Sequence, residues 1–167
     1  DSLYVRIDED TPEYRALAKD GAYWITLPGS DRPLTAELVG YSQENAVKLV
    51  ERLEHIARWR TTKDLANPTS QIAGKVQMTV YKASKDDALE GNARLTQTLS
   101  NGKPVYPAIK VKIKNNSADV LYCSLLSLSE SFAIDPLLQL NNHVERLEPG
   151  QELELNQGKP MRFAVPD

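Results

Sequence analysis

From residue 75 onward, apolar and polar residues alternate in short runs, and this period of two restricts that part of the chain to β-structure. In AIKVKIKN, residues 108–115, Ile109, Val111 and Ile113 fall on one face and the intervening lysines on the other. Because successive side chains of a strand point to opposite faces, this run predicts a strand with one buried face. The lysine face is either solvated or belongs to a sheet edge that is guarded against pairing.

Several more runs of this kind follow, divided by Asn-Asn, Glu-Pro-Gly and Gly-Lys-Pro turns. VLYCSLLSL is the most apolar, so we expect it in the centre of a sheet. Because no helical period interrupts these runs, residues 75–167 are predicted to form an antiparallel, immunoglobulin-like β-sandwich. The polar residues 83–104 are expected to be a long loop. The expected strands lie within residues 75–82, 108–115, 120–128, 132–137, 151–156 and 161–165.

The N-terminal part has a different character. LYVRI, residues 3–7, alternates like a short strand, and TPEYRALAKDG suggests one or two helical turns with Pro12 at the first position and Gly21 as the stop. AYWITLPGSDRPLTAELV, residues 22–39, has two apolar runs divided by a Pro-Gly-Ser-Asp turn. That pattern predicts a hairpin.

The clearest helix starts at Ser42, with SQENAVKLVERLEHIARWR, and Asn67-Pro68 excludes its continuation. Its apolar stripe should pack against the N-terminal hairpin, the sandwich or both, because apolar surface left in water loses about 25 cal/mol per Å² that burial would contribute. We expect contact with both. We therefore predict a small α+β unit at 1–74, with a linker at 61–74, followed by the β-sandwich domain at 75–167. The stripe consists of Ala46, Leu49, Val50, Leu53, Ile56 and Ala57.

Composition and charge narrow the possible functions. The chain has 167 residues, 41% of them hydrophobic and 26% charged, which is typical of a globular protein with a real core. Its net charge of −3 supplies no positive field for nucleic acid. No apolar run approaches the ~20 residues of a membrane span. A lone cysteine and the absence of a signal-peptide pattern favour the cytoplasm, and the opening on Asp1 suggests a piece of a longer protein.

The lone cysteine is the first candidate for chemistry. A catalytic thiol needs a nearby base and partial exposure. Cys123 alternates with Leu121 and Leu125, so we expect its side chain in the core, over nine-tenths buried and out of reach of His143. His55 lies on the predicted helix beside its apolar stripe. We therefore predict that none of these residues is catalytic.

Metal and cofactor sites are not expected either. Two histidines and one cysteine without short ligand spacing do not make a metal site. The carboxylates at 8–10 and at Asp86, Asp87 and Glu90 lack the pattern of a calcium loop and are interpreted as solvated loops. No phosphate-binding loop or dinucleotide fingerprint occurs in the sequence, so no cofactor is predicted.

The order of several short motifs adds a resemblance. A helix ending in RLEHIARW runs into LANPTS, a strand ends in NNS, LYCSLLSL follows, and LEPG closes the series. In this order the motifs resemble the accessory region C-terminal to the catalytic domain in bacterial caspase-like proteins (peptidase C14 relatives), over roughly residues 20–165. The matching residues are Arg52, Leu53, Glu54, His55, Arg58, Trp59, Asn67, Pro68, Ser70, Asn115, Ser117, Leu121, Tyr122, Leu125, Leu126, Leu128, Leu147, Pro149 and Gly150.

The resemblance implies a non-catalytic partner of a cysteine peptidase. The family's catalytic dyad lies in a His-Gly pair and an Asp-x-Cys-x-Gly setting, whereas here His55 precedes Ile56, His143 precedes Val144 and Cys123 follows Tyr122. The expected partner is thus a caspase-like catalytic domain of the same polypeptide, which this chain would bind or regulate.

The alternative function is a small-ligand or carbohydrate-binding β-sandwich. That function needs several exposed aromatic side chains near one loop edge. The candidates are Trp24, Trp59, Tyr81, Tyr106 and Tyr122, most of them placed where the strands and the helix need core.

Overall fold

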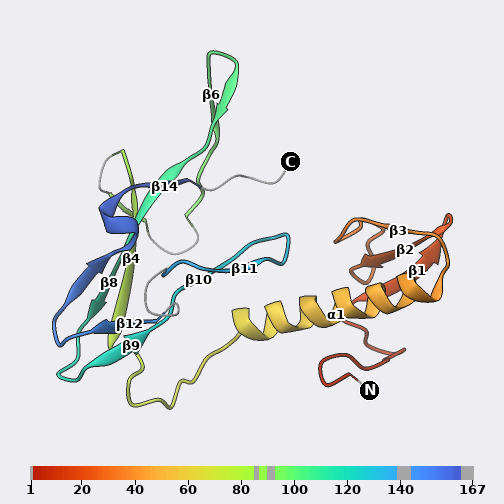
Figure 1. Cartoon of the computed structure of the whole chain (residues 1–167), viewed down its shortest axis with the longest axis horizontal. Helices are drawn as coiled ribbons and strands as arrows, with labels where there is room; N and C mark the ends of the chain where they lie inside the picture. The colour runs from red at the N-terminus through yellow and green to blue at the C-terminus, as the bar shows by residue number, and fades with distance from the viewer. Residues whose placement is uncertain (1, 85–86, 90–92, 139–143, 163–167) are drawn as a thin grey trace. The chain divides into compact units, whose positions relative to one another are not determined.

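The computed structural model describes residues 2–84, 87–89, 93–138 and 144–162. They form a mainly β fold of antiparallel sheets with one α-helix (Figure 1). Contacts divide the chain into two compact units. The first unit comprises residues 1–65 and 128–134, and the second comprises residues 66–127 and 135–167. The segment 128–134 thus belongs by its contacts to the first unit.

The first unit is built on a three-stranded antiparallel sheet in the order β1-β2-β3. Its strands are β1 (Arg15–Lys19), β2 (Ala22–Thr26) and β3 (Leu38–Val39). The predicted pairing within residues 22–39 is confirmed, since Ala22 lies opposite Val39 and Tyr23 opposite Leu38.

The helical turns predicted before Gly21 are wrong, because β1 occupies that sequence. Asp20 and Gly21 have φ angles of 53° and 82°, so both adopt the left-handed region that a two-residue hairpin turn requires. That turn pairs β1 with β2 along their whole length. Residues 3–7, predicted as a strand, have irregular structure instead.

The predicted helix is confirmed as α1, Gln43–Lys63. The Ser42 hydroxyl caps its start by accepting a hydrogen bond from the Asn45 N–H at 3.1 Å. At its end the Asp64 N–H donates to the Arg60 carbonyl, and irregular structure follows at Asn67-Pro68.

One face of α1 packs on the sheet and forms the core of the first unit. Leu49 and Ile56 are buried there with Ile25 of β2 and Leu38 of β3, and Leu53 packs against them. This confirms the predicted contact of the stripe with the N-terminal hairpin, while its expected contact with the sandwich stays a prediction. Val50 is an exception: at 46% exposure it lies beside the contact rather than within it.

The second unit contains a five-stranded sheet in the order β13-β8-β4-β5, in which β14 also pairs with β8. The predicted alternation in β8 is confirmed, since Ile109, Val111 and Ile113 are buried. Because β8 is paired on both of its sides, the guarded-edge interpretation of its lysines is wrong. The strands are β4 (Val76–Lys82), β5 (Ala88–Leu89), β8 (Ala108–Asn115), β13 (Glu152–Glu154) and β14 (Met161–Arg162).

Three small antiparallel sheets involve the remaining strands. They pair β6 (Thr98–Ser100) with β7 (Lys103–Val105), β9 (Leu121–Cys123) with β12 (Glu145–Leu147), and β10 (Leu126–Leu128) with β11 (Ile134–Pro136). A short 3₁₀ segment, Leu155–Gly158, follows β13.

Two predictions are corrected by these small sheets. Residues 120–128 do not form a central strand, because they divide between β9 and β10 and Tyr122 is 70% exposed. The loop predicted at 83–104 contains β5 and the β6-β7 hairpin. Asn101 and Gly102, with φ of 51° and 72°, close that hairpin in the same left-handed turn geometry.

The core of the second unit is a separate cluster. It consists of Ile109, Val111, Ile113, Leu138, Leu147 and Leu155, with partly buried residues such as Val80 and Cys123 at its margin. The mainly β, antiparallel class is therefore confirmed, while the immunoglobulin-like arrangement of the sheets stays a prediction.

Candidate functional site

Cys123 lies in the second unit at the end of β9 and packs against the margin of its core. It is only partly buried, so the expectation of more than nine-tenths burial is wrong. β9 belongs to a two-stranded sheet with β12, so it has a strand neighbour on one side only, whereas a central strand has one on each side. Burial still raises the pKa of the Cys123 thiol above its ordinary value, which disfavours the nucleophilic thiolate. His143 lies outside the described residues.

His55 lies in the first unit, on α1. Its Nε2 is 2.7 Å from the backbone carbonyl oxygen of Phe132, which is 77 positions later in the sequence. Since a carbonyl only accepts, the ring nitrogen donates to it and the Nε2–H form of the imidazole is selected. The histidine therefore holds a loop against the helix.

The carboxylates at residues 8–10 belong to a local turn. The Asp8 carboxylate accepts hydrogen bonds from the backbone N–H groups of Thr11 and Asp10, at 2.9 and 3.1 Å. The Thr11 bond is the largest reason why the pKa of Asp8 is lowered. In the second cluster, Asp86 and Glu90 lie outside the described residues. No group of three or more potential metal ligands occurs in the part of the chain that the structure describes.

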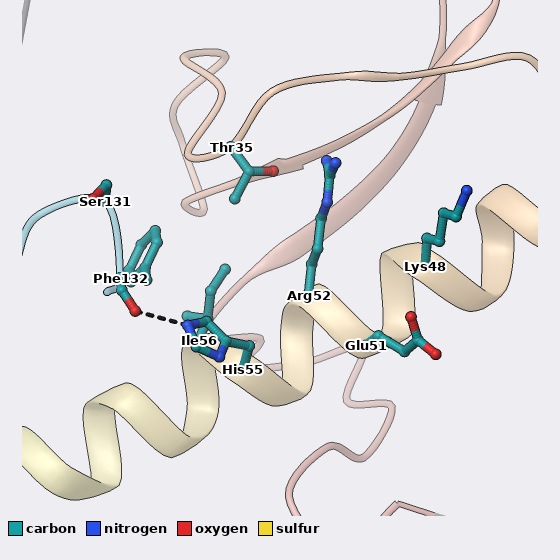
Figure 2. A pocket seen from close by; sticks show the side chains of 8 residues that line it. All are labelled: Thr35, Lys48, Glu51, Arg52, His55, Ile56, Ser131 and Phe132. Carbon is teal, nitrogen blue, oxygen red and sulfur yellow. Dashed lines mark hydrogen bonds between the residues drawn. The ribbon is translucent and has the colours of Figure 1, made fainter. Parts of the chain in front are cut away.

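A pocket of about 360 Å³ lies in the first unit, along α1 (Figure 2). Phe132 and Ser131 form one wall, and Thr35 stands across the opening from the helix. Arg52 extends from the helix toward Thr35, whereas the carboxylate of Glu51 points away from it. The lining residues are Thr35, Lys48, Glu51, Arg52, His55, Ile56, Ser131 and Phe132.

The Phe132 wall is held in place by several contacts. Its φ of 65° is in the left-handed region, which is uncommon for a bulky side chain. Its N–H donates to the Ser129 carbonyl at 3.1 Å, and its own carbonyl accepts from His55. The ring packs edge-on against Trp59, with centroids 5.4 Å apart and an angle of 85°. This side of the pocket is thus preformed.

Arg52 differs from the other arginines of α1 in its partners. Arg58 pairs with Glu54 at 3.5 Å, and Arg60 pairs with Glu13 at 3.0 Å. Arg52 donates one hydrogen bond to the Ala36 carbonyl, and no carboxylate among the described residues pairs with it. Arg52 as a whole residue is partly exposed, and its guanidinium has N–H donors left for a ligand.

Lys48, the second cation at the pocket, is already paired. Its Nζ lies 2.6 Å from the Glu44 carboxylate one helical turn earlier. The hydrogen bond from Lys48 is the main reason why the pKa of Glu44 is lowered. The available positive charge is therefore concentrated on Arg52, beside the apolar wall of Phe132.

Sequence reasoning placed His55, Arg52 and Ile56 on one helix but missed the pocket. Thr35 comes from the segment between β2 and β3, and Ser131 and Phe132 come from the loop between β10 and β11. No local sequence pattern links these segments to α1, so the sequence did not predict that they line one pocket with the helix.

A second cavity of about 880 Å³ lies between residues 2–17 and α1, where Leu53 and Ala57 line it. Tyr4 belongs to the N-terminal segment that lines this cavity. The centre of its ring lies 4.9 Å from the guanidinium of Arg58 on α1, a cation–π contact. Leu3 and Ile7 of this segment are 96% and 94% exposed. They are the most exposed large apolar side chains in the described part of the chain.

No helix among the described residues has both the length and the apolarity to cross a membrane. No family model, curated protein or solved structure matches this chain.

Proposed function

We propose that this chain is a non-catalytic accessory domain of a caspase-like cysteine peptidase, and that it binds and regulates the catalytic domain of the same polypeptide. The proposal rests on the order of motifs from RLEHIARW to LEPG and on one structural observation. That observation is the nearly complete exposure of Leu3 and Ile7.

Leu3 and Ile7 belong to an alternating segment with no strand partner among the described residues. Leu3 and Ile7 are almost fully exposed, whereas Val5 between them is partly buried. Tyr4, between them, is held by Arg58 of α1. The segment is therefore attached to its own unit through Tyr4, while Leu3 and Ile7 remain available to a partner.

A partner protein gains from covering such a segment. An extended peptide that joins the edge of a sheet gains main-chain hydrogen bonds, and its alternate side chains enter pockets of the partner. Each apolar side chain covered contributes about 25 cal/mol per Å² of surface removed from water. We therefore propose that residues 3–7 add to a sheet edge of the catalytic domain.

The test is a binding measurement with the catalytic domain of the same polypeptide as the probe. The double variant Leu3→Asp with Ile7→Asp should weaken binding by about tenfold or more in titration calorimetry, because it places charge in an apolar contact. The matched control is Leu99→Asp in β6, where the side chain is also mostly exposed at 74%. Both proteins should keep their melting temperature.

Two results would overturn the proposal. One is unchanged affinity in the Leu3 and Ile7 double variant. The other is the absence of a caspase-like His-Gly and Asp-x-Cys-x-Gly dyad from the polypeptide that carries this chain.

The carbohydrate or small-ligand alternative has less support. Of its five candidate aromatic residues, only Tyr122 is exposed, and the others are partly buried. A flat sugar-binding surface needs several aromatic faces together. Glycan binding that is lost in Tyr122→Ala would favour this alternative.

A further inference from the structure

We infer that the pocket along α1 binds a monoanionic carboxylate joined to an apolar group. The carboxylate would pair with Arg52, and the apolar group would lie against Phe132. This site involves none of the residues 3–7, so its test and the test of the proposed docking fail or succeed independently.

The first support is that the Arg52 guanidinium has no carboxylate partner among the described residues. A guanidinium presents a planar fork of donors that matches a carboxylate with two parallel hydrogen bonds. The neighbouring Arg58 and Arg60 already have carboxylate partners, whereas Arg52 has only the Ala36 carbonyl among the described residues. Because Arg52 as a residue is only partly exposed, solvent screens an ion pair there less than at a fully exposed arginine.

The second support is the charge around Arg52, which favours a single negative charge. Lys48 is neutralised by Glu44, and Glu51 adds a carboxylate at the margin of the pocket. A phosphate with nearly two negative charges would have one unpaired guanidinium to offset them, beside the Glu51 carboxylate. A carboxylate needs only that one guanidinium.

The third support is the size and rigidity of the apolar part. The volume of about 360 Å³ is near the lower end of small-molecule sites, which begin at roughly 300 Å³. It suits one aromatic or branched side chain. Because Phe132 is fixed by His55, Trp59 and its own turn, the wall requires little ordering when a ligand binds.

The experiment titrates the chain with 3-phenylpropionate and follows its ¹⁵N–¹H spectrum. The Arg52 side-chain N–H and the Phe132 amide should shift, and the matched amide, 3-phenylpropanamide, should bind at least about tenfold more weakly because it lacks the charge. Equal binding of acid and amide would overturn the inference. Tighter binding of phenyl phosphate would overturn the preference for a single charge.

Variants locate the site. Arg52→Gln should weaken 3-phenylpropionate binding by about tenfold, and Arg52→Lys should retain part of it because the charge stays while the fork is lost. The control is Arg58→Gln on the same helix, which should leave binding unchanged. If the spectrum of Arg52→Gln without ligand shows that the fold has changed, the Arg52→Lys variant provides the test. Undiminished affinity for 3-phenylpropionate in Arg52→Lys would contradict a bidentate contact.

Such a carboxylate could come from a protein C-terminus or from a free small acid, and titration with a peptide distinguishes the two. An acetylated tripeptide that ends in a free phenylalanine carboxylate is compared with its C-terminal amide and with 3-phenylpropionate. Binding of the peptide acid about tenfold tighter than 3-phenylpropionate would identify a protein C-terminus as the ligand. Weaker binding of the peptide acid would identify a free small acid. Equal binding of the peptide acid and the peptide amide would overturn the inference.

Discussion

Asn115 shows how one side chain can organise a whole corner of the second unit. It is fully buried at the end of β8. Its amide donates to the carbonyl oxygens of Asp119, Leu147 and Glu148, at 2.7, 3.1 and 3.2 Å. Its side-chain oxygen accepts from the N–H and hydroxyl of Ser117, at 2.9 and 2.7 Å. Both the nitrogen and the oxygen of the Asn115 amide are thus needed to satisfy the hydrogen bonds of this corner.

Asn115→Asp should lower the free energy of unfolding by about 3 kcal/mol or more. The change keeps the shape but replaces the donors with an oxygen that faces three carbonyls, and unsatisfied buried polar groups cost about 1–3 kcal/mol each. Urea unfolding measures the effect. The control Asn116→Asp, at an exposed neighbour, should change stability by less than about 0.5 kcal/mol. Equal losses in the two variants would contradict the role of Asn115.

Cys123 should react slowly with Ellman's reagent. Burial raises the pKa of its thiol, so the folded chain holds less thiolate at any pH below that pKa. The pH midpoint of the reaction rate should therefore lie above that of the same thiol in the unfolded chain. The same chain unfolded in urea is the control and should react faster at pH 8. A midpoint lower in the folded chain than in the unfolded chain would indicate an activated cysteine instead.

At the scale of elements, two hairpins depend on short turns in the left-handed region. Asp20-Gly21 joins β1 to β2, and Asn101-Gly102 joins β6 to β7. Such turns match the right-handed twist of the strands they connect. The Asp-Gly turn decides that residues 15–19 extend and pair, although their sequence also fits a helical turn.

Gly21→Ala should lower the free energy of unfolding by about 1–2 kcal/mol. A Cβ at Gly21 meets no atom within 4 Å, so the loss arises from its φ of 82° and not from a clash. Gly21→Asn is the control and should lose less, because asparagine tolerates the left-handed region better. Thermal unfolding of the three proteins gives the comparison. A larger loss in the asparagine variant would contradict this origin.

At the scale of the whole molecule, the described apolar residues form two separate cores. One contains Ile25, Leu38, Leu49 and Ile56 of the first unit, and the other contains Ile113 and its neighbours in the second. The two clusters have no residue in common. A change in one core should therefore leave the packing of the other unaltered.

Ile25→Val and Ile113→Val should each lower the free energy of unfolding by about 1 kcal/mol, since each removes one buried methylene. In the double variant the two losses should add to within about 0.5 kcal/mol, as expected for sites without shared partners. Denaturant unfolding of the four proteins tests this. A coupling energy above about 1 kcal/mol would show that the two cores act as one.

The sequence by itself determined the elements whose signals are local. Ser42 and the apolar stripe predicted α1, and the alternation of isoleucine, valine and lysine predicted β8. Both succeed because capping and side-chain period act within a few residues. The turns at Asp20-Gly21 and Asn101-Gly102 are also local signals, and reading them as hairpin turns would have predicted β1, β6 and β7.

Only the tertiary structure decided the division of residues 120–128 and the composition of the pocket. VLYCSLLSL fits a central strand by its apolar content, yet β9 and β10 pair with different strands, and Tyr122 faces solvent. Phe132 reaches His55 across 77 positions of sequence. The partners of Arg52 depend on the same folding of distant segments. Such contacts depend on which strands pair and which loops they bring to a helix, and no pattern within one segment carries that information.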